Sequence, residues 1–347
     1  MKTLVQFSKG IKSIPLATGW YLSDLSEAKG KQELFTKQAP QKLKVLREHA
    51  LIESAVSSNR IEGVNADKSR IGTLVFGKPD FRDRNEEEIK GYRDALTLIH
   101  SEKNKLKISE TTIKKLHKMC RGEIWDAGKY KQKNIDIIQK YNDGTEKIRF
   151  KTVSANQTAD FMKQSLKLYN TAFKEKWAPP LIITAAFNFD FLCVHPFRDG
   201  NGRVSRLLWL LSCYHLGFDV GRFISLERII EENKEQYYEA LELSSVDWHK
   251  GKHNPWYFIN YTLYILKLAY KEFEQRVNKL DTPKGAKTVL IIEAIKKQTG
   301  EFTINDIEKK CPAVGRDWIK KQLAKLKNEK IISCKGKGTA ARWFLIK

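Results

Sequence analysis

Twelve consecutive residues, 195–206, gather side chains that can handle phosphates: HPFRDGNGRVSR. His195 can act as a general base near neutral pH. Asp199 supplies a carboxylate that could hold Mg²⁺ against phosphate oxygens. Gly200 and Gly202 lack side chains, so backbone N–H groups can approach a ligand closely. A base, a metal ligand and a glycine-rich turn in one loop are typical of phosphoryl or nucleotidyl transfer.

The same segment lies between two apolar runs, Leu181–Val194 and Leu207–Phe218, which both indicate buried helices. It is therefore a loop that enters a helix at about Gly202, and the first turn of that helix offers unpaired N–H groups and a positive dipole end. Arg203 and Arg206 lie three residues apart on this turn, so both can reach phosphate oxygens bidentately. These features predict an anion site at a helix N-terminus.

Each feature also has an ordinary explanation when it is taken alone. A histidine beside an apolar run is usually a core residue, a Gly-Asn-Gly sequence is usually only a turn, and paired arginines usually lie on a solvated helix face. The combination of all three within twelve residues favours chemistry over coincidence.

HPFRDGNGRVSR resembles the Fic signature, HxFx(D/E)GNGRxxR, at every fixed position. The resemblance implies a helical Fic core with a β-hairpin flap, and transfer of AMP from ATP, with Mg²⁺, to Ser, Thr or Tyr hydroxyls of a protein. It implies that His195 deprotonates the hydroxyl, that Phe197 anchors the loop and that Asp199 binds Mg²⁺. The unaltered GNGR sequence favours AMP over phosphate as the transferred group. The residues implied to bind the ATP phosphates are Arg198, Gly200, Asn201, Gly202, Arg203 and, on the γ-phosphate, Arg206.

A second segment, Ser58-Asn59-Arg60-Ile61-Glu62-Gly63, resembles the inhibitory motif of the family, (S/T)xxxE(G/N). On a helix, Ser58 and Glu62 share one face. The resemblance implies a salt bridge from Glu62 to Arg206 that removes the partner of the γ-phosphate. An ordinary helix C-terminus at Gly63 is the alternative explanation.

Isoleucines alternate with polar residues on both sides of Asn142-Asp143-Gly144, which predicts a β-hairpin over Lys131–Val153. The resemblance implies that this hairpin is the flap, which pairs with the target backbone and covers the nucleotide; a plain surface hairpin is the alternative. The flap residues expected to border the site are Ile135, Asp136, Ile137 and Ile138.

Two adjacent tyrosines, Tyr237 and Tyr238, are similar to the pair that lines the adenosine pocket in relatives. Aromatic faces can stack on a base. Core aromatics on an amphipathic helix would give the same pattern, so the role of each tyrosine stays open.

These segments need a helical framework, and helical periodicity prevails over the first 280 of the 347 residues. Asp281–Gly285 breaks the pattern and is the expected linker. We expect a mainly α fold in three parts: an N-terminal helical region, 1–109, with the inhibitory helix at about 50–63; the Fic core, 110–280; and a small α+β winged-helix domain, 286–347.

The formal net charge of +22 suggests nucleic acid, nucleotides or acidic partners, although solvated lysine faces would also explain it. The last part has about fifteen Lys and Arg against about six Asp and Glu, and Gly315–Asn328 could be a recognition helix. An alternative function is therefore a DNA-binding regulator whose Fic core senses nucleotide. The intact His195 favours the enzyme, because a sensor needs no base. Removal of AMP, with Glu62 orienting a water, is a further alternative.

The remaining expectations concern partners and location. The target is another protein or the chain itself, and a homodimer is left open. Five scattered cysteines without a CxxC pair argue against a metal cluster or a disulfide framework, and Cys193 and Cys213 are expected in the core.

Met1–Gly10 lacks the apolar region of a secretory signal, and no apolar run reaches the length of a membrane span. We expect a cytoplasmic protein without membrane contact.

Overall fold

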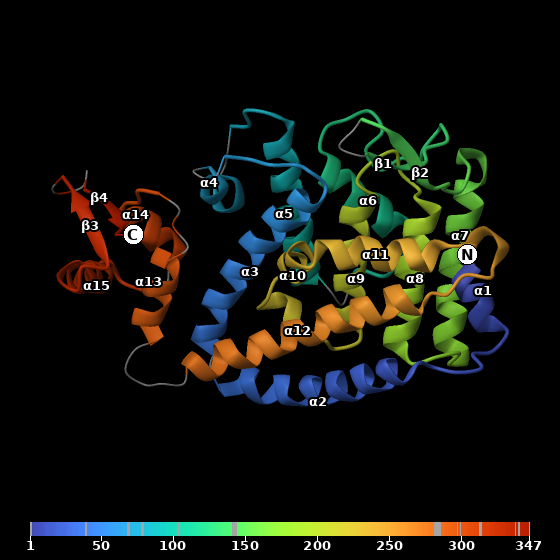
Figure 1. Cartoon of the computed structure of the whole chain (residues 1–347), viewed down its shortest axis with the longest axis horizontal. Coiled ribbons are helices and arrows are strands. Elements are labelled where there is room, and N and C mark those ends of the chain that lie inside the picture. The colour runs from blue at the N-terminus through green and yellow to red at the C-terminus, as the bar shows by residue number, and fades with distance from the viewer. Residues whose placement is uncertain are drawn as a thin grey trace.

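The computed structural model describes residues 2–346 except for 39, 68–69, 78–79, 103–104, 141–143, 281–285, 297, 299, 312–313, 337 and 339–340. Helices dominate the described residues, which confirms the expected mainly α class (Figure 1). The only sheets in this part of the chain are two antiparallel pairs of short strands. Within it, no helix combines the length and the apolar character that crossing a membrane requires.

The N-terminal region consists of helices that pack against the later part of the chain. Figure 1 shows α2 lying alongside α12, and α3 packs against both α5 and α10. Helix α3 carries the expected inhibitory segment at its C-terminal end, close to the middle of the molecule. The bounds of these helices are α1 Lys2–Ser8, α2 Leu16–Gln38, α3 Pro40–Ile61, α4 Ile71–Phe76 and α5 Arg84–Glu102.

Two apolar helices form the centre of the molecule. Every residue of α8 from Leu181 to Val194 is buried, and α9 is buried from Arg203 to Tyr214. A helix that is apolar all round belongs inside a protein, as the sequence predicted. The segment between α8 and α9 is the loop of the motif. The helices of this part are α6 Glu110–Arg121, α7 Ala155–Glu175, α8 Pro180–Val194, α9 Asn201–His215, α10 Leu226–Glu232, α11 Lys234–Ser245 and α12 Trp256–Leu280, with short 3-10 turns at Val220–Arg222 and Trp248–Lys250.

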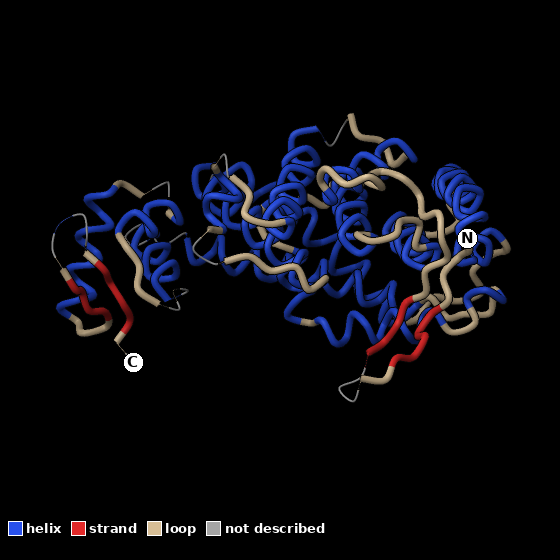
Figure 2. Tube along the Cα trace, turned by 90° about the horizontal axis from the view of Figure 1, so that it is seen from above, coloured by secondary structure: helices blue, strands red, loops and turns tan. Residues whose placement is uncertain are grey.

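The predicted hairpin is present but shorter than its sequence pattern. Strands β1 (Ile137–Lys140) and β2 (Glu146–Phe150) pair antiparallel, and Figure 2 shows them in red, projecting from the helices. The turn expected at Asn142-Asp143-Gly144 lies partly outside the described residues. Residues 131–136 form no strand, because this segment instead bonds to the motif loop: the Lys131 N–H donates to the Pro196 carbonyl at 2.9 Å.

The C-terminal part has a hydrophobic core of its own, built around Ile291, Ile307 and Leu323. Its elements follow in the order helix, helix, helix and hairpin, and a bridge between Phe302 and Trp343 extends the hairpin. On the last helix Trp318 is 37% exposed, whereas its neighbour Ile319 is fully buried. The expected linker, Asp281–Gly285, lies outside the described residues. The elements are α13 Ala286–Lys296, α14 Ile304–Lys310, α15 Arg316–Asn328, β3 Ile332–Lys335 and β4 Arg342–Leu345.

Candidate active site

His195 ends helix α8 in a left-handed backbone conformation, with φ 51° and ψ 63°. Its Nδ1 lies 3.3 Å from the carbonyl oxygen of Leu192. A carbonyl can only accept, so Nδ1 carries the hydrogen and Nε2 keeps a free lone pair. Burial and then the charge of Lys131 lower the pKa of His195 from 6.5 to about 4. The imidazole is therefore neutral at pH 7 and can take up a proton through Nε2.

The loop after His195 is held in shape by the side chain of Asn201. Its Oδ1 accepts from the Phe197 N–H at 2.9 Å, and its Nδ2 donates to the Phe197 carbonyl at 2.8 Å. Phe197 is fully buried, as the anchoring role implies. The Asn201 side chain thus bonds to the loop itself, so its backbone N–H is the group left to meet a phosphate.

A second histidine supports the same loop from helix α6. The ring of His117 stacks on Phe197 with centroids 3.8 Å apart. Its Nδ1 accepts from the Gly128 N–H at 2.8 Å, so Nε2 is the protonated nitrogen and donates to the Asp199 carbonyl at 2.9 Å. Burial lowers the pKa of His117 to about 4, which keeps this arrangement neutral. Sequence reasoning missed His117, because it lies far from the motif in an ordinary amphipathic helix.

At the N-terminus of α9, where the sequence predicts a cradle for an anion, a carboxylate of the chain lies against the first turn. Gly200 has φ +79°, which only glycine adopts readily, and Gly202 follows in the first turn. A Cβ on Gly202 would come within 2.2 Å of Oε1 of Glu62. The absence of a side chain at Gly202 therefore leaves room for an anionic oxygen directly against the helix N-terminus.

Arg206 brings the two predicted motifs together. Its Nη2 donates to Oε1 of Glu62 and to the carbonyl of Ser58, and its Nε donates to Oγ of Ser58, each at 2.8 Å. The Ser58 and Glu62 side chains thus reach the same guanidinium from one helix face, and Gly63 leaves the helix with φ +80°. The third nitrogen, Nη1, is buried without a partner and would lie 3.2 Å from a Cβ on Gly202. An unpaired donor facing the cradle fits a site for anionic oxygens.

Arg203 is anchored more deeply than its predicted phosphate contact suggests. It is 1% exposed, and its Nη1 donates to Oε2 of Glu88 at 2.6 Å and to Oδ1 of Asn59 at 3.2 Å. Glu88 also pairs with Arg121 at 2.5 Å. This buried network fixes the first turn of α9 to α3, α5 and α6. Sequence reasoning missed Glu88, because it lies in a charged run typical of a solvated helix face.

Asp199 is the acidic side chain of the loop, and it is half exposed. Its Oδ2 pairs with Arg121 at 2.7 Å, and its Oδ1 accepts from the Gly200 N–H at 2.5 Å. Burial would raise its pKa, but Arg121 and Arg203 outweigh that effect and the pKa is lowered. The carboxylate is therefore charged at neutral pH. Among the described residues no three His, Cys, Asp or Glu side chains cluster as metal ligands. A single carboxylate suits Mg²⁺ that is held largely by substrate phosphates and water.

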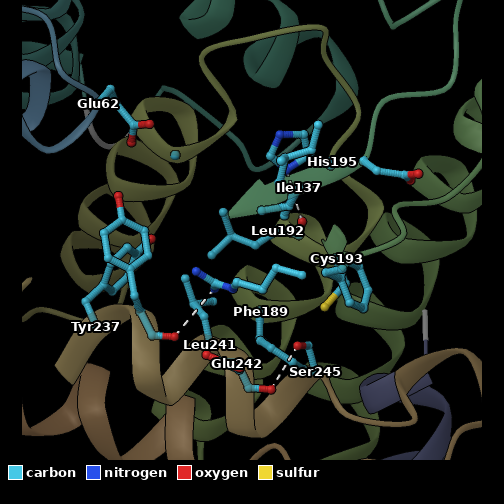
Figure 3. Close-up of a pocket in the computed structure, with 16 residues that line it drawn as sticks. Glu62, Ile137, Phe189, Leu192, Cys193, His195, Tyr237, Leu241, Glu242 and Ser245 are labelled. Atoms are coloured by element: carbon cyan, nitrogen blue, oxygen red, sulfur yellow. Dashed lines mark hydrogen bonds between the residues drawn. The ribbon is translucent and has the colours of Figure 1, made fainter. Parts of the chain in front are cut away.

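A cavity of about 540 Å³ opens beside His195 and Gly202, a volume that suits a nucleotide. Figure 3 shows Glu62 and His195 at its upper side and Leu241, Glu242 and Ser245 at its lower side. The predicted flap and tyrosine residues that line it are Asp136, Ile137, Ile138, Tyr237 and Tyr238. The cavity thus runs from the anion cradle to an aromatic and apolar wall.

Several predicted site residues do not line the cavity themselves; around the start of α9 these are Ser58, Gly63, Asp199, Gly200, Asn201, Arg203 and Arg206. Two others, Ile135 and Arg198, are directed elsewhere. Ile135 does not belong to its wall, because its carbonyl accepts from the Thr152 hydroxyl and fixes the base of the hairpin. Arg198 turns towards Asp126, with which it pairs at 2.5 Å, and stacks over the exposed Trp125 ring. Neither side chain is directed at the cradle.

Several solved structures of similar fold carry Fic in their descriptions. They include a Fic family protein from Desulfovibrio desulfuricans G20 (18% identity, TM-score 0.62, covering 97% of this chain and 98% of that one) and a Fic domain containing signaling protein from Bacteroides thetaiotaomicron VPI-5482 (21%, 0.57, 73% and 98%). Fic-1 from C. elegans is similar at 18% identity and a TM-score of 0.59, over 76% and 75% of the two chains. These likenesses define the class of fold, a Fic fold.

One segment of the chain also matches a family model. Residues 107–213 match the model of the Fic/DOC family. This segment contains α6, α7, α8 and most of α9, together with the hairpin and the motif loop. A comparison with curated protein sequences finds no match.

Proposed function

We propose that the protein transfers AMP from ATP to a hydroxyl side chain of a protein, and that Glu62 inhibits this reaction. The observation that carries the proposal is the site itself: a neutral His195 opens a nucleotide-sized cavity beside a glycine-rich helix N-terminus. The carboxylate of Glu62 takes the place of an anionic oxygen in that cradle. The position that the Glu62 carboxylate fills is therefore the position at which we expect an oxygen of the ligand to bind.

ATP fits the cavity with its phosphates at the α9 N-terminus and its base against the wall formed by α11. The backbone N–H groups of the first turn and the unpaired Nη1 of Arg206 are the donors for phosphate oxygens. Tyr237, Tyr238 and Leu241 offer flat and apolar surface for adenosine. Mg²⁺, held by Asp199 and the phosphates, would neutralise charge on the leaving group.

The reaction forms one bond and breaks one bond. The hydroxyl oxygen of the target attacks the α-phosphorus of ATP, and Nε2 of His195 takes the hydroxyl proton. The bond from the α-phosphorus to the bridging oxygen of the β-phosphate breaks, and pyrophosphate leaves with that oxygen. AMP remains on the target as a phosphodiester. The hydrogen bond from Nδ1 to the Leu192 carbonyl stabilises the imidazolium that this step creates.

The central experiment compares ATP labelled on the α-phosphate with ATP labelled on the γ-phosphate. Purified Glu62→Gly protein is incubated with each, with Mg²⁺ and with cell lysate as a source of target. Label on protein from the α-position alone supports transfer of AMP. Label from the γ-position would show phosphate transfer instead, and label from neither, despite ATP binding, would reject the transferase.

A second candidate function rests on the C-terminal part. Lys320, Lys321 and Lys327 are exposed on α15, whose packed residues are Ile319, Gln322, Leu323 and Leu326. A basic helix face beside a hairpin suits the phosphate backbone of duplex DNA, and a regulator of this kind would use the Fic domain to sense nucleotide.

This candidate predicts a salt-dependent affinity for DNA. The double variant Lys321→Glu, Lys327→Glu should bind a random-sequence duplex at least about tenfold more weakly, and the slope of log affinity against log salt should fall by about 2. Fluorescence anisotropy with a labelled duplex measures both quantities. The matched control is Lys163→Glu, Lys167→Glu, which changes the same charge on the exposed face of α7. Equal weakening by both pairs would mean that net charge alone is responsible, and no binding by the parent protein would remove the candidate.

A further inference from the structure

Lys131 is a buried lysine that forms no ion pair with any described residue. It is 4% exposed, whereas lysines are almost never fully buried without a charged partner. Its ammonium donates only to neutral oxygens, the Thr152 hydroxyl at 2.7 Å and the Val194 carbonyl at 3.1 Å. Burial lowers its pKa to about 8 despite the opposing charge of Asp136. Such an arrangement costs free energy of folding, so it calls for a reason beyond packing.

The contacts of Lys131 bracket His195. The ammonium binds the carbonyl of Val194, directly before the histidine, and the backbone N–H of Lys131 donates to the carbonyl of Pro196, directly after it. One residue thus fixes the peptide groups on both sides of a histidine whose left-handed backbone is uncommon for a residue with a side chain. The orientation of the imidazole depends on this backbone.

The same ammonium reaches the hairpin. Thr152, which follows strand β2, receives a hydrogen bond from Lys131 and donates one to the carbonyl of Ile135, just before β1. Lys131 therefore links the base of the hairpin to the loop of His195 through a short chain of hydrogen bonds. A displacement of the hairpin is transmitted to the histidine through this link.

We infer that Lys131 is a positioning residue for His195, which fixes the backbone of the catalytic histidine and couples it to the hairpin that lies over the cavity. This inference rests on the transferase proposed above. The charge of Lys131 has a second effect, since it disfavours the protonated imidazole. The other charged groups that act on His195 are Glu62 and Asp199, and both favour the protonated form. Among these charged groups, Lys131 is thus the one that favours the neutral imidazole, which can accept a proton.

The test replaces Lys131 with methionine, which keeps the length of the side chain and removes its charge and donors. In the Glu62→Gly background we expect kcat to fall roughly 10- to 100-fold, as for a misplaced catalytic group, with KM for ATP unchanged. Because a nearby cation lowers the pKa of His195, its removal raises that pKa, and the acid limb of the rate profile moves to higher pH. Thr152→Val, which removes only the hydroxyl partner, should lower kcat with a smaller change in the acid limb. Lys133→Met is the matched control, an exposed lysine on the same segment.

An NMR titration of the His195 ring makes the test independent of turnover. The pKa of His195 should be higher in Lys131→Met than in the parent, and equal to the parent in Lys133→Met. An unchanged kcat and an unchanged histidine pKa in Lys131→Met would overturn the inference. If the Glu62→Gly parent transfers no label, the proposed function fails, while the titration still decides whether Lys131 acts on His195. If Lys131→Met does not fold, Thr152→Val carries the kcat measurement, and Lys131→Gln, which keeps a donor but removes the charge, carries the titration; a parental kcat in the first and a parental histidine pKa in the second would overturn the inference.

Discussion

Replacing Glu62 with glycine is expected to raise the rate of label transfer from α-labelled ATP roughly 10- to 100-fold. The change removes the carboxylate that lies against Gly202 and frees Nη2 of Arg206 for the substrate. A charge-assisted hydrogen bond contributes about 1.5–3 kcal/mol, which corresponds to that range of rates when the contact competes with a phosphate. The measurement is incorporation of α-label into protein at a fixed ATP concentration.

Two further variants separate the effect of the Glu62 charge from the effect of loosening the end of α3. Glu62→Gln keeps the size of the side chain but loses the charge, so it should activate less than glycine and more than the parent. Arg60→Gly is the matched control. It introduces a glycine two residues earlier in the chain, and the side chain that it removes pairs with Glu231 and not with α9. If Arg60→Gly activated as strongly as Glu62→Gly, loosening of the α3 end would be the cause, and the competition between Glu62 and phosphate would be refuted.

Besides Arg206, Tyr238 also contacts the segment that carries Glu62. The Tyr238 hydroxyl donates to the carbonyl of Ile61 at 3.3 Å, and the Tyr238 ring lies in the cavity wall. The end of α3 therefore bonds to a tyrosine that belongs to the proposed adenosine site. We therefore expect a nucleotide that displaces Tyr238 to loosen the segment that carries Glu62. Binding in the cavity and the contact between Glu62 and Arg206 would then be coupled.

The sequence predicted the parts of the site that depend on local pattern. The motif loop between two apolar helices, the α9 N-terminus and the helix face shared by Ser58 and Glu62 all follow from residues close together in the chain. The mainly α class was also readable, because helical periodicity covers most of the chain. The contact between Glu62 and Arg206, 144 residues apart, was reached only through the resemblance of both motifs to one family.

The supporting residues could not be predicted, because nothing in their local sequence distinguishes them. Glu88 and Lys131 lie in charged segments that suggest solvent exposure, and both are buried. His117 lies in an amphipathic helix where the stacking partner, Phe197, is 80 residues away. For Arg198 the motif position suggested a phosphate contact, and in this structure the side chain pairs with Asp126, which local sequence did not indicate either. The burial of a charged side chain and its choice of a distant partner are tertiary effects, and periodicity does not reveal them.

Replacing His195 with alanine is expected to lower transfer in the Glu62→Gly background by about 10²- to 10⁴-fold, the usual contribution of a general base. Binding of ATP should not change, because the cradle at α9, Arg206 and the wall formed by α11 remain in place. The two measurements are the rate of α-label incorporation and the dissociation constant of ATP by calorimetry. A parental rate in His195→Ala would show that another group takes the hydroxyl proton.

The ring of His195 also determines how transfer depends on pH. Its pKa of about 4 means that the imidazole is neutral, and able to accept a proton, throughout the range above about pH 5. Protonation as the pH falls through 4 removes the lone pair on Nε2, so transfer should decline there and not near 6.5, the ordinary pKa of histidine. His117, with a pKa also near 4, would lose its bond from the Gly128 N–H over the same range. His117→Phe keeps a flat ring on Phe197 but cannot titrate. If the acid limb of the rate profile remains in His117→Phe and is absent in His195→Ala, it reports the titration of His195 and not that of His117.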